Sequence, residues 1–391
     1  MTEKLFHTEP QTLVFSAKII HLERRGDNGA VVLDRTAFYP ESGGQPADRG
    51  TLGAKTVLDV QYEGEKIVHL IDGPVKVGST VECKVDAARR EDHSTHHSAQ
   101  HLITAVFLRH GDYRTMAFHL SSEVATIDLT GDITSELLDE VESEVNGEVR
   151  AGKPLEVRTV TRAGFDAMDL RKKDLPDDVK EVRLVEIEGV DVAHCGGTHV
   201  NSTSEIGFVV FARTERVKSL TRLHFLAGER ARKYVSELKS SIEDAAAVLS
   251  AGWRELPNRA KEILEDLKNI RKMRKAAEKE VIDRMVREFA ASSEPFVEIR
   301  TDDIEPAHLA ALARRLGKQG KIAVVSSGMG LIAIATPEGH SLDAGSVVAA
   351  VKKDFPVKGG GRGDFAQIAE VSKEMMPAVR RRIVEMFREA E

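Results

Sequence analysis

The sequence is poor in cysteine and in aromatic residues. Its two cysteines are Cys83 and Cys195, and aromatic side chains make up 5% of the chain. Two cysteines are too few for a disulfide framework, so the sequence favours a reducing compartment, and we expect the cytoplasm. Apolar runs of about 18 residues, which would span a membrane, are absent, as is a signal-peptide pattern at the N-terminus. The sequence therefore predicts a globular protein that makes no contact with a membrane.

The chain also lacks an excess of positive charge. Its 56 basic and 63 acidic side chains give a net charge of −7, which argues against general attraction to nucleic acids and anionic membranes. The charge is uneven, since residues 1–256 carry 32 basic and 42 acidic side chains, whereas residues 257–291 carry 10 and 7. Residues 295–391 carry 14 and 13. A polyanion is therefore expected to contact mainly the C-terminal half.

The length of 391 residues is enough for two or three domains. Residues 13–86 form short segments in which apolar and polar residues alternate, a pattern that predicts strands. Asp86 is a suitable N-cap for a helix over residues 87–109. These patterns predict the α+β class, with a small β-barrel over residues 1–90 and an α/β module over residues 91–228.

The pattern changes between residues 229 and 294, where apolar residues recur at spacings of three and four. Such spacing is typical of long amphipathic helices. Gly252 and Pro257 separate two such segments, so we expect an antiparallel helical hairpin, with a single kinked rod as the alternative. Met273 lies on the apolar stripe and is therefore expected in a core.

Residues 295–391 again combine predicted strands and helices, and they predict a separate α/β domain. Its glycine-dense run, GGGRGDFAQ, begins at Gly359. We expect this run to precede a helix and to present backbone N–H groups to phosphate, with Arg362 as a further phosphate contact. A homodimer, if one forms, is expected to use the helical hairpin or this domain.

Two pairs of side chains have the spacing of metal ligands. His97 and His101 lie four residues apart on the predicted helix, which places both imidazoles on one helix face. Cys195 and His199 flank the glycines of AHCGGTHV, which let the chain turn back on one ion. One cysteine and three histidines form a tetrahedral set suited to Zn²⁺. The alternative is a buried cysteine with scattered structural histidines.

The same motifs resemble those of a known family. HHSAQHL is similar to the HxxxH motif, and AHCGGTHV to the CxxxH motif, of the alanyl-tRNA synthetase editing domain and of its free-standing relatives, the AlaX proteins. TAFYPESGGQPADRG resembles the glycine-rich segment that precedes the HxxxH helix, and GGGRGDFAQ resembles the signature of the synthetase's C-terminal domain. The order and spacing match the large AlaX form over nearly the whole chain. One departure is His194, which stands where the synthetases usually have leucine.

The resemblance implies a trans-editing hydrolase that deacylates tRNA(Ala) mischarged with serine, and also with glycine, at the zinc site. It assigns Thr36 to reading the serine hydroxyl and Gln45 to the editing site. Gly43 and Gly44 would let backbone donors approach the substrate. The tRNA-binding residues that it implies in the C-terminal domain are Gly359, Gly360, Gly361 and Arg362.

Two other functions share some of these features. A threonyl-type editing hydrolase has the same HxxxH and CxxxH ligands, although the GGQ segment and GGGRGDFAQ argue against it. A non-catalytic tRNA-binding protein with a structural zinc is the alternative outside the enzymes, and Thr36 and Gln45 argue against that function. The role of zinc stays open between orienting the substrate and activating water.

Overall fold

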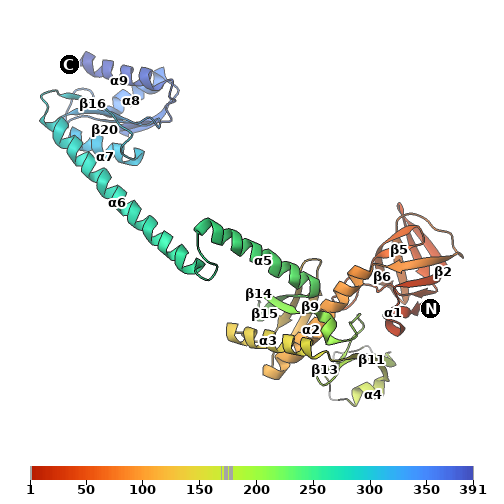
Figure 1. Cartoon of the computed structure of the whole chain (residues 1–391). Coiled ribbons are helices and arrows are strands. Elements are labelled where there is room, and N and C mark those ends of the chain that lie inside the picture. The colour runs from red at the N-terminus through yellow and green to blue at the C-terminus, as the bar shows by residue number, and fades with distance from the viewer. Residues whose placement is uncertain (1, 169, 171–174, 176–178, 391) are drawn as a thin grey trace. The chain divides into compact units, whose positions relative to one another are not determined.

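The computed structural model describes residues 2–168, 170, 175 and 179–390 (Figure 1). Helices and strands are interspersed along the chain, which confirms the predicted mixture of α and β structure. The chain forms two compact units, Met1–Asp244 and Ala245–Glu391. Among the described residues, no helix has both the length and the apolar character that crossing a membrane requires.

The first unit contains six strands that pair around a closed ring, which closes because β8 pairs with both β5 and β2. Alternate residues of β2 point inward, so Phe15, Ala17 and Ile19 are buried while their neighbours are exposed. A short pair of strands, β1 (Glu3–Lys4) and β4 (Arg35–Thr36), lies outside the ring sheet, and the short helix α1 (Leu5–Thr8) follows β1. In ring order, the strands are β2 (Val14–Arg25), β3 (Asn28–Leu33), β7 (Lys66–Ile71), β6 (Lys55–Glu63), β5 (Gly50–Leu52) and β8 (Thr80–Val85).

Helix α2 (Ala87–His110) is the central element of this unit, and it agrees with the prediction to within one residue. Its N-cap is Asp86, whose side chain accepts a hydrogen bond from the backbone N–H of Arg89. The helix packs in one core with α3 (Ser135–Ala151) and a four-stranded antiparallel sheet. The strand order in this sheet is β14 (Val209–Val217), β15 (Leu220–Ala227), β10 (Ala125–Leu129) and β9 (Thr115–Leu120).

A smaller sheet brings the second ligand motif to α2. It consists of β11 (Leu155–Thr161), β12 (Glu181–Ile187) and β13 (Asp191–His194), with α4 (Arg162–Asp166) following β11. The chain leaves β13 through the CGGTH segment and then enters the 3₁₀ helix η1 (Thr203–Ile206), which contacts α2. The loop between β13 and η1 is therefore held beside α2 at both ends.

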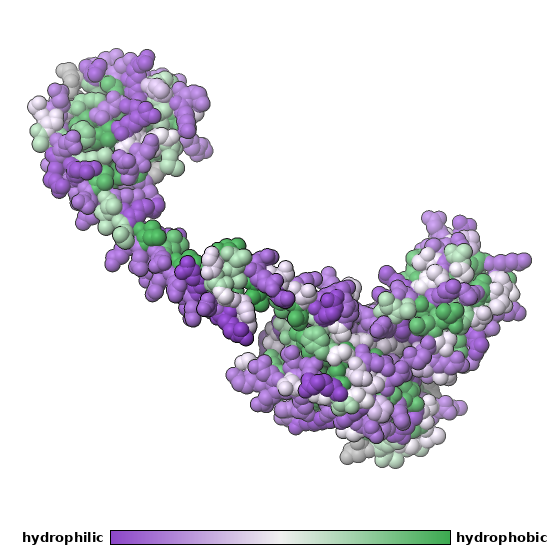
Figure 2. Space-filling view, viewed as in Figure 1, coloured by the Kyte–Doolittle hydropathy of each residue, from purple (hydrophilic) through white to green (hydrophobic). Residues whose placement is uncertain are grey.

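Two helices occupy the region between the predicted domains, as expected. They are α5 (Gly228–Leu249) and α6 (Leu256–Ala291), and their pairing as a hairpin stays a prediction. Apolar and polar side chains are both visible on the surface of α6 (Figure 2). The expected burial of Met273 is wrong, because its side chain is 72% exposed, whereas Ile282 and Val286 farther along α6 are buried. An apolar stripe predicts which face of a helix is apolar, but it does not predict which neighbouring element covers that face.

The second unit contains a five-stranded sheet with helices on both sides (Figure 1). Neighbouring residues of β17 point to opposite faces, so that Val324 packs with α8 and α9 and Val325 packs with α7 and the end of α6. The sheet order is β16 (Phe296–Arg300), β17 (Ile322–Ser326), β18 (Ile332–Ala335), β20 (Phe365–Ala369) and β19 (Lys358–Arg362). The helices are α7 (Pro306–Gly317), α8 (Ala344–Asp354) and α9 (Met376–Ala390).

The glycine-dense run does not precede a helix, and this expectation is wrong. Gly359, Gly360, Gly361 and Arg362 lie in β19, which pairs with β20 as a hairpin at the edge of the sheet. Close packing explains the glycines, because a Cβ atom on Gly361 would lie 2.3 Å from the Cα atom of Ala366. This run therefore does not form a helix N-terminus whose backbone N–H groups could bind a phosphate.

Candidate metal centre and its cavity

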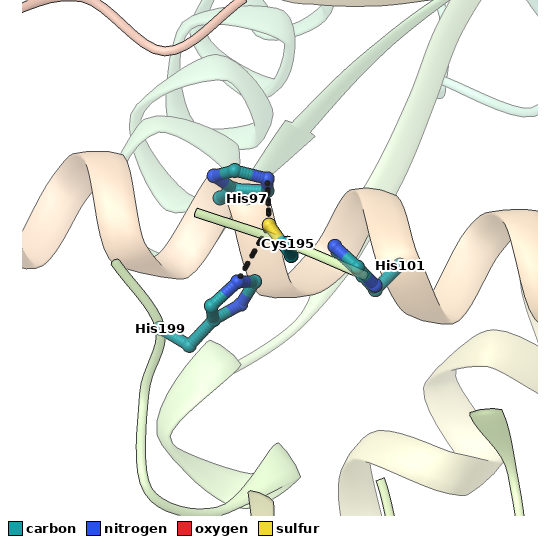
Figure 3. A group of neighbouring side chains, drawn as sticks. All are labelled: His97, His101, Cys195 and His199. Carbon is teal, nitrogen blue, oxygen red and sulfur yellow. Dashed lines mark hydrogen bonds between the residues drawn. The ribbon is translucent and has the colours of Figure 1, made fainter. Parts of the chain in front are cut away.

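The structure brings the four predicted metal ligands together. His97 and His101 project from one face of α2, and Cys195 and His199 approach them from the loop after β13 (Figure 3). Their candidate ligand atoms all lie within 4.8 Å of one another, and all four residues are buried. The Cys195 sulfur lies 3.2 Å from Nε2 of His97 and 3.3 Å from Nε2 of His199. This cluster could hold a metal ion that accepts sulfur and nitrogen ligands.

A second group of side chains sets the orientation of the three imidazoles. Each ring has its Nδ1 atom near an oxygen of another side chain, at distances of 2.8 to 3.3 Å. The oxygen belongs to Gln45 for His97, to Ser98 for His199 and to Asp191 for His101. These contacts leave the other nitrogen of each ring available to a metal, which is the arrangement of well-ordered metal sites.

The charges in the cluster suit metal binding. Burial raises the pKa of the Cys195 thiol, but the interactions with the neighbouring side chains of His97, His199 and His101 outweigh burial, so that the pKa falls well below 9.0. Burial lowers the pKa of His199 to about 3, which keeps this imidazole neutral. Burial also disfavours charge on His101, yet Cys195 and Asp191 raise its pKa to about 9. A thiolate and a neutral imidazole are ready ligands, and a bound cation would displace the proton of His101.

The loop that carries Cys195 is held by close packing and by two side chains. Gly197 must be glycine, because a Cβ atom there would lie 2.1 Å from Cε1 of His97. Arg183 on β12 donates from Nη1 to the carbonyl oxygen of Cys195 at 2.6 Å, and Nε2 of His7 lies 3.0 Å from the carbonyl oxygen of Gly196. Nε and Nη2 of Arg183 are buried and have no hydrogen-bond partner in the described part of the chain. Sequence reasoning missed both side chains, because no local pattern connects them to the loop.

A cavity of about 720 Å³ lies beside the cluster, and His97, His101 and Cys195 form part of its wall. The rest of the wall mixes apolar side chains with a few polar ones, as is usual for small-molecule sites. Gln100 and Thr115 are polar side chains in this wall, and sequence reasoning did not find them. The local spacing could have indicated Gln100, because it lies three residues after His97 and hence on the same helix face.

The residues predicted for the editing site do not all reach this cavity. Gly43 lies in the cavity wall, whereas Gly44 packs against β9, where a Cβ atom would lie 2.3 Å from the carbonyl oxygen of Phe118. Gln45 contacts His97 and Thr198 and is fully buried, but it is not part of the cavity wall.

Thr36 is fully buried and is likewise not part of the cavity wall. Its hydroxyl lies 2.8 Å from Nε2 of His69, on β7 of the strand ring, and accepts a hydrogen bond from the backbone N–H of Phe38. Contact of Thr36 or Gln45 with a substrate therefore stays a prediction. His194, the departure from the synthetase motif, does line the cavity.

Comparison with known families agrees with this architecture. Residues 7–89 match the family described as class II (A) tRNA synthetases. Residues 182–224 match the second additional domain of threonyl and alanyl tRNA synthetases, and this segment contains Cys195 and His199. Over these two segments the chain is therefore similar to class II tRNA synthetases and to the second additional domain of the threonyl and alanyl enzymes.

Similar proteins of known name indicate more closely which synthetase-related proteins the chain resembles. The chain is 32% identical to the alanine–tRNA ligase of Methanopyrus kandleri over 93% of its length, and this match spans 42% of the ligase. It is 29% identical to the alanyl-tRNA editing protein Aarsd1 of Danio rerio over 81% of its length and 79% of that protein. Aarsd1-A of Xenopus laevis is 35% identical over 58% of the chain and 55% of that protein. The resemblance to AlaX-type proteins is thus confirmed, and the chain spans about two-fifths of the ligases that it matches.

Proposed function

We propose that the protein is a hydrolase that deacylates tRNA(Ala) mischarged with serine, and also with glycine. The observation that carries the proposal is the buried cysteine–histidine cluster in the wall of a 720 Å³ cavity. Relatives named as alanyl-tRNA editing proteins support the same substrate class. In the reaction, water adds to the ester carbonyl, the bond to the terminal ribose oxygen breaks, and serine and uncharged tRNA leave.

Selectivity explains why such a hydrolase is needed. A synthetase pocket for alanine distinguishes glycine or serine by only about 1–3 kcal/mol, because the side chains differ by one small group. A second site that hydrolyses the errors must spare alanine. The cavity beside the cluster supplies a separate pocket in which such a choice can be made.

We further propose that the metal is Zn²⁺, held by the four ligands. One sulfur and three nitrogen donors, with the imidazoles oriented by outer side chains, form a set that this ion prefers. When bound, zinc would supply positive charge that orients the substrate and would hold the four ligands together beside the cavity. The chain's own contribution is to keep Cys195 ionised and to hold the loop with Arg183 and Gly197.

We propose that the C-terminal domain binds tRNA and that the side chain of Arg362 contacts the tRNA. Arg362 ends the exposed edge strand β19, and its Cα atom would lie 3.2 Å from a Cβ atom on Gly345, at the start of α8. A guanidinium at this edge can form paired hydrogen bonds with a phosphate. A homodimer through the helices or this domain stays part of the proposal.

Deacylation assays with Ser-, Gly- and Ala-tRNA(Ala), measured side by side, test the function. We expect hydrolysis of the seryl and glycyl esters and little of the alanyl ester. Replacing Cys195 with Ala should remove the metal and the activity together, because the thiolate is a central ligand. The function is wrong if neither mischarged tRNA is hydrolysed faster than in buffer.

A further inference from the structure

One arginine in the first turn of α5 contacts two other elements of the first unit. Arg230 donates from Nε to Oδ1 of Asp92 on α2 at 2.7 Å, and its Nη2 pairs with the other carboxylate oxygen. Its Nη1 donates to the backbone carbonyl of Ser121, directly after β9, at 2.8 Å. The side chains of Arg230 and Asp92 are 15% and 28% exposed. A planar guanidinium can form these bonds together, so Arg230 fixes the end of β9 relative to α2.

Both elements that Arg230 contacts contribute to the wall of the cavity. Helix α2 carries the candidate ligands His97 and His101, which follow Asp92 along the helix. Strand β9 contributes residues 115–118 to the same wall. Arg230 itself is not part of the wall. Its contacts therefore determine how two parts of the wall lie relative to each other.

The end of β9 also contacts the GGQ segment (residues 43–45). The backbone N–H of Leu120 donates to the carbonyl of Gly44 at 3.0 Å. Gly44 lies between Gly43, which is in the cavity wall, and Gln45, whose Oε1 lies 2.8 Å from Nδ1 of His97. A shift of β9 at its end would therefore be passed through direct contacts to the GGQ segment and to His97.

The attachment of α5 to α2 does not depend on the bond to Ser121. The backbone N–H of Ala227, just before α5, donates to Nε2 of His96 on α2 at 3.2 Å. The proton of this imidazole is then on Nδ1, which donates to the carbonyl of Asp92 at 2.8 Å. His96 is fully buried, as is Ala231 in the first turn of α5. The contact with Ser121 is thus a separate connection, from a helix start already fixed to α2.

We propose that Arg230 is a positioning residue for the reaction, because it holds β9 and the GGQ segment in place relative to the candidate ligands on α2. It acts through β9 and does not touch the substrate. Such positioning affects the rate strongly, since a displacement of about 1 Å caused by a distant substitution can cost about 100-fold. This inference rests on the proposed function.

Arg230→Lys tests the proposal in the full-length protein. Lysine keeps the positive charge beside Asp92, but its single ammonium group lacks the planar fork that bonds Asp92 and Ser121 together. We expect the kcat for Ser-tRNA(Ala) to fall roughly 10-fold, with KM within about twofold and zinc content unchanged. Arg232→Lys is the matched control, because Arg232 lies in the same turn, is 63% exposed and pairs with Glu229 of the same helix.

Asp92→Asn is a second variant that leaves residue 230 unchanged. The amide oxygen can still accept one bond from Arg230, whereas the paired contact and the negative charge are lost. The kcat should fall in the same direction but less than in Arg230→Lys. Unchanged kcat in both variants would overturn the inference.

Amide hydrogen exchange separates this inference from the proposed hydrolysis, because it needs no substrate. In Arg230→Lys, exchange should be faster in β9 and in the GGQ segment, and it should keep the wild-type rate in α3. Wild-type exchange in β9 and the GGQ segment would overturn the inference, as would faster exchange there with unchanged kcat. If the wild type does not hydrolyse Ser-tRNA(Ala), the proposed function fails, and the exchange rates still decide whether Arg230 positions β9.

Discussion

Gln45 shows how one side chain can organise a candidate metal site without being one of its candidate ligands. Its Oε1 lies 2.8 Å from Nδ1 of His97 and accepts from the backbone N–H of Thr198, while its Nε2 donates to the hydroxyl of Thr198. His97 and Thr198 are both buried, and the Thr198 hydroxyl also accepts a hydrogen bond from Ser94. The GGQ segment therefore contributes to the metal centre through the orientation of His97.

Replacing Gln45 with Leu should weaken zinc binding roughly 10- to 100-fold, because His97 loses the partner that orients its ring. Competition with a chromophoric chelator measures this affinity. Gln11→Leu is a suitable control, since Gln11 is exposed and bonds to Asn201 at the surface. Unchanged zinc affinity in Gln45→Leu would show that His97 is held by its helix alone.

His69 makes the stability of the strand ring depend on pH. Burial lowers its pKa to about 4, from 6.5, because the folded protein holds the ring neutral. Above pH 6.5 the ring is neutral in both states, and the full stability is present. As the pH falls from 6.5 towards 4, the unfolded state takes up a proton first, and stability is lost.

The loss attributable to His69 should approach about 3 kcal/mol at pH 4, since each pKa unit corresponds to about 1.4 kcal/mol. Denaturant unfolding at pH 7 and at pH 4.5 measures it. His69→Gln, which can still accept a hydrogen bond from Thr36, should show a smaller difference between the two pH values. An equal difference would assign the acid sensitivity to other groups.

At the scale of elements, the loop after β13 must approach α2 closely. Gly197 and Gly196 are neighbours in this loop, but only Gly197 faces the helix, where a Cβ atom would overlap with His97. A Cβ atom on Gly196 would meet no atom within 4 Å. The two glycines of the motif therefore have different structural roles.

We expect Gly197→Ala to displace the loop, lower the zinc affinity and abolish most of the activity, whereas Gly196→Ala should bind zinc nearly as the wild type does. Zinc content after gel filtration and the thermal unfolding midpoint distinguish the two variants. Equal behaviour of both would mean that the loop adjusts to a side chain at either position.

For the whole molecule, the boundary of the first unit lies within α5. Arg230, in the first turn of α5, donates from Nε to Asp92 on α2 at 2.7 Å and from Nη1 to the Ser121 carbonyl at 2.8 Å. Ala231 is also buried. A chain that ends at Gly228 would lose these contacts, so Asp244 is the better end for a truncated protein.

A protein of residues 1–244 should keep its zinc and hydrolyse Ser-tRNA(Ala) at high substrate concentration, with a raised KM. Residues 1–256 carry 42 acidic against 32 basic side chains, so the positive balance lies in the removed part. The salt dependence of tRNA binding should weaken by nearly one unit of slope for each lost phosphate contact. Equal tRNA affinity and equal slope in the truncated and full-length proteins would leave the C-terminal unit without a role in binding.

Local features of this protein follow from the sequence alone. The helix over residues 87–110 was predictable because Asp86 caps it and apolar residues recur along it, and its geometry places His97 and His101 together. The two glycines between Cys195 and His199 likewise predict a turn that brings their side chains close. Each of these conclusions depends on residues within one or two turns of one another.

Tertiary structure decided the features that depend on how separate helices and strands pack against one another. A glycine-rich run suits an exposed loop as well as a crowded hairpin, and only the packing of β19 on β20 makes Gly361 a close-contact residue. The position of Thr36 against His69, and that of Thr115 against Thr104, depend on which strands and helices become neighbours. Local spacing does not say which strands and helices become neighbours. It therefore indicates the candidate metal ligands, whereas the packed fold determines which polar groups face the cavity.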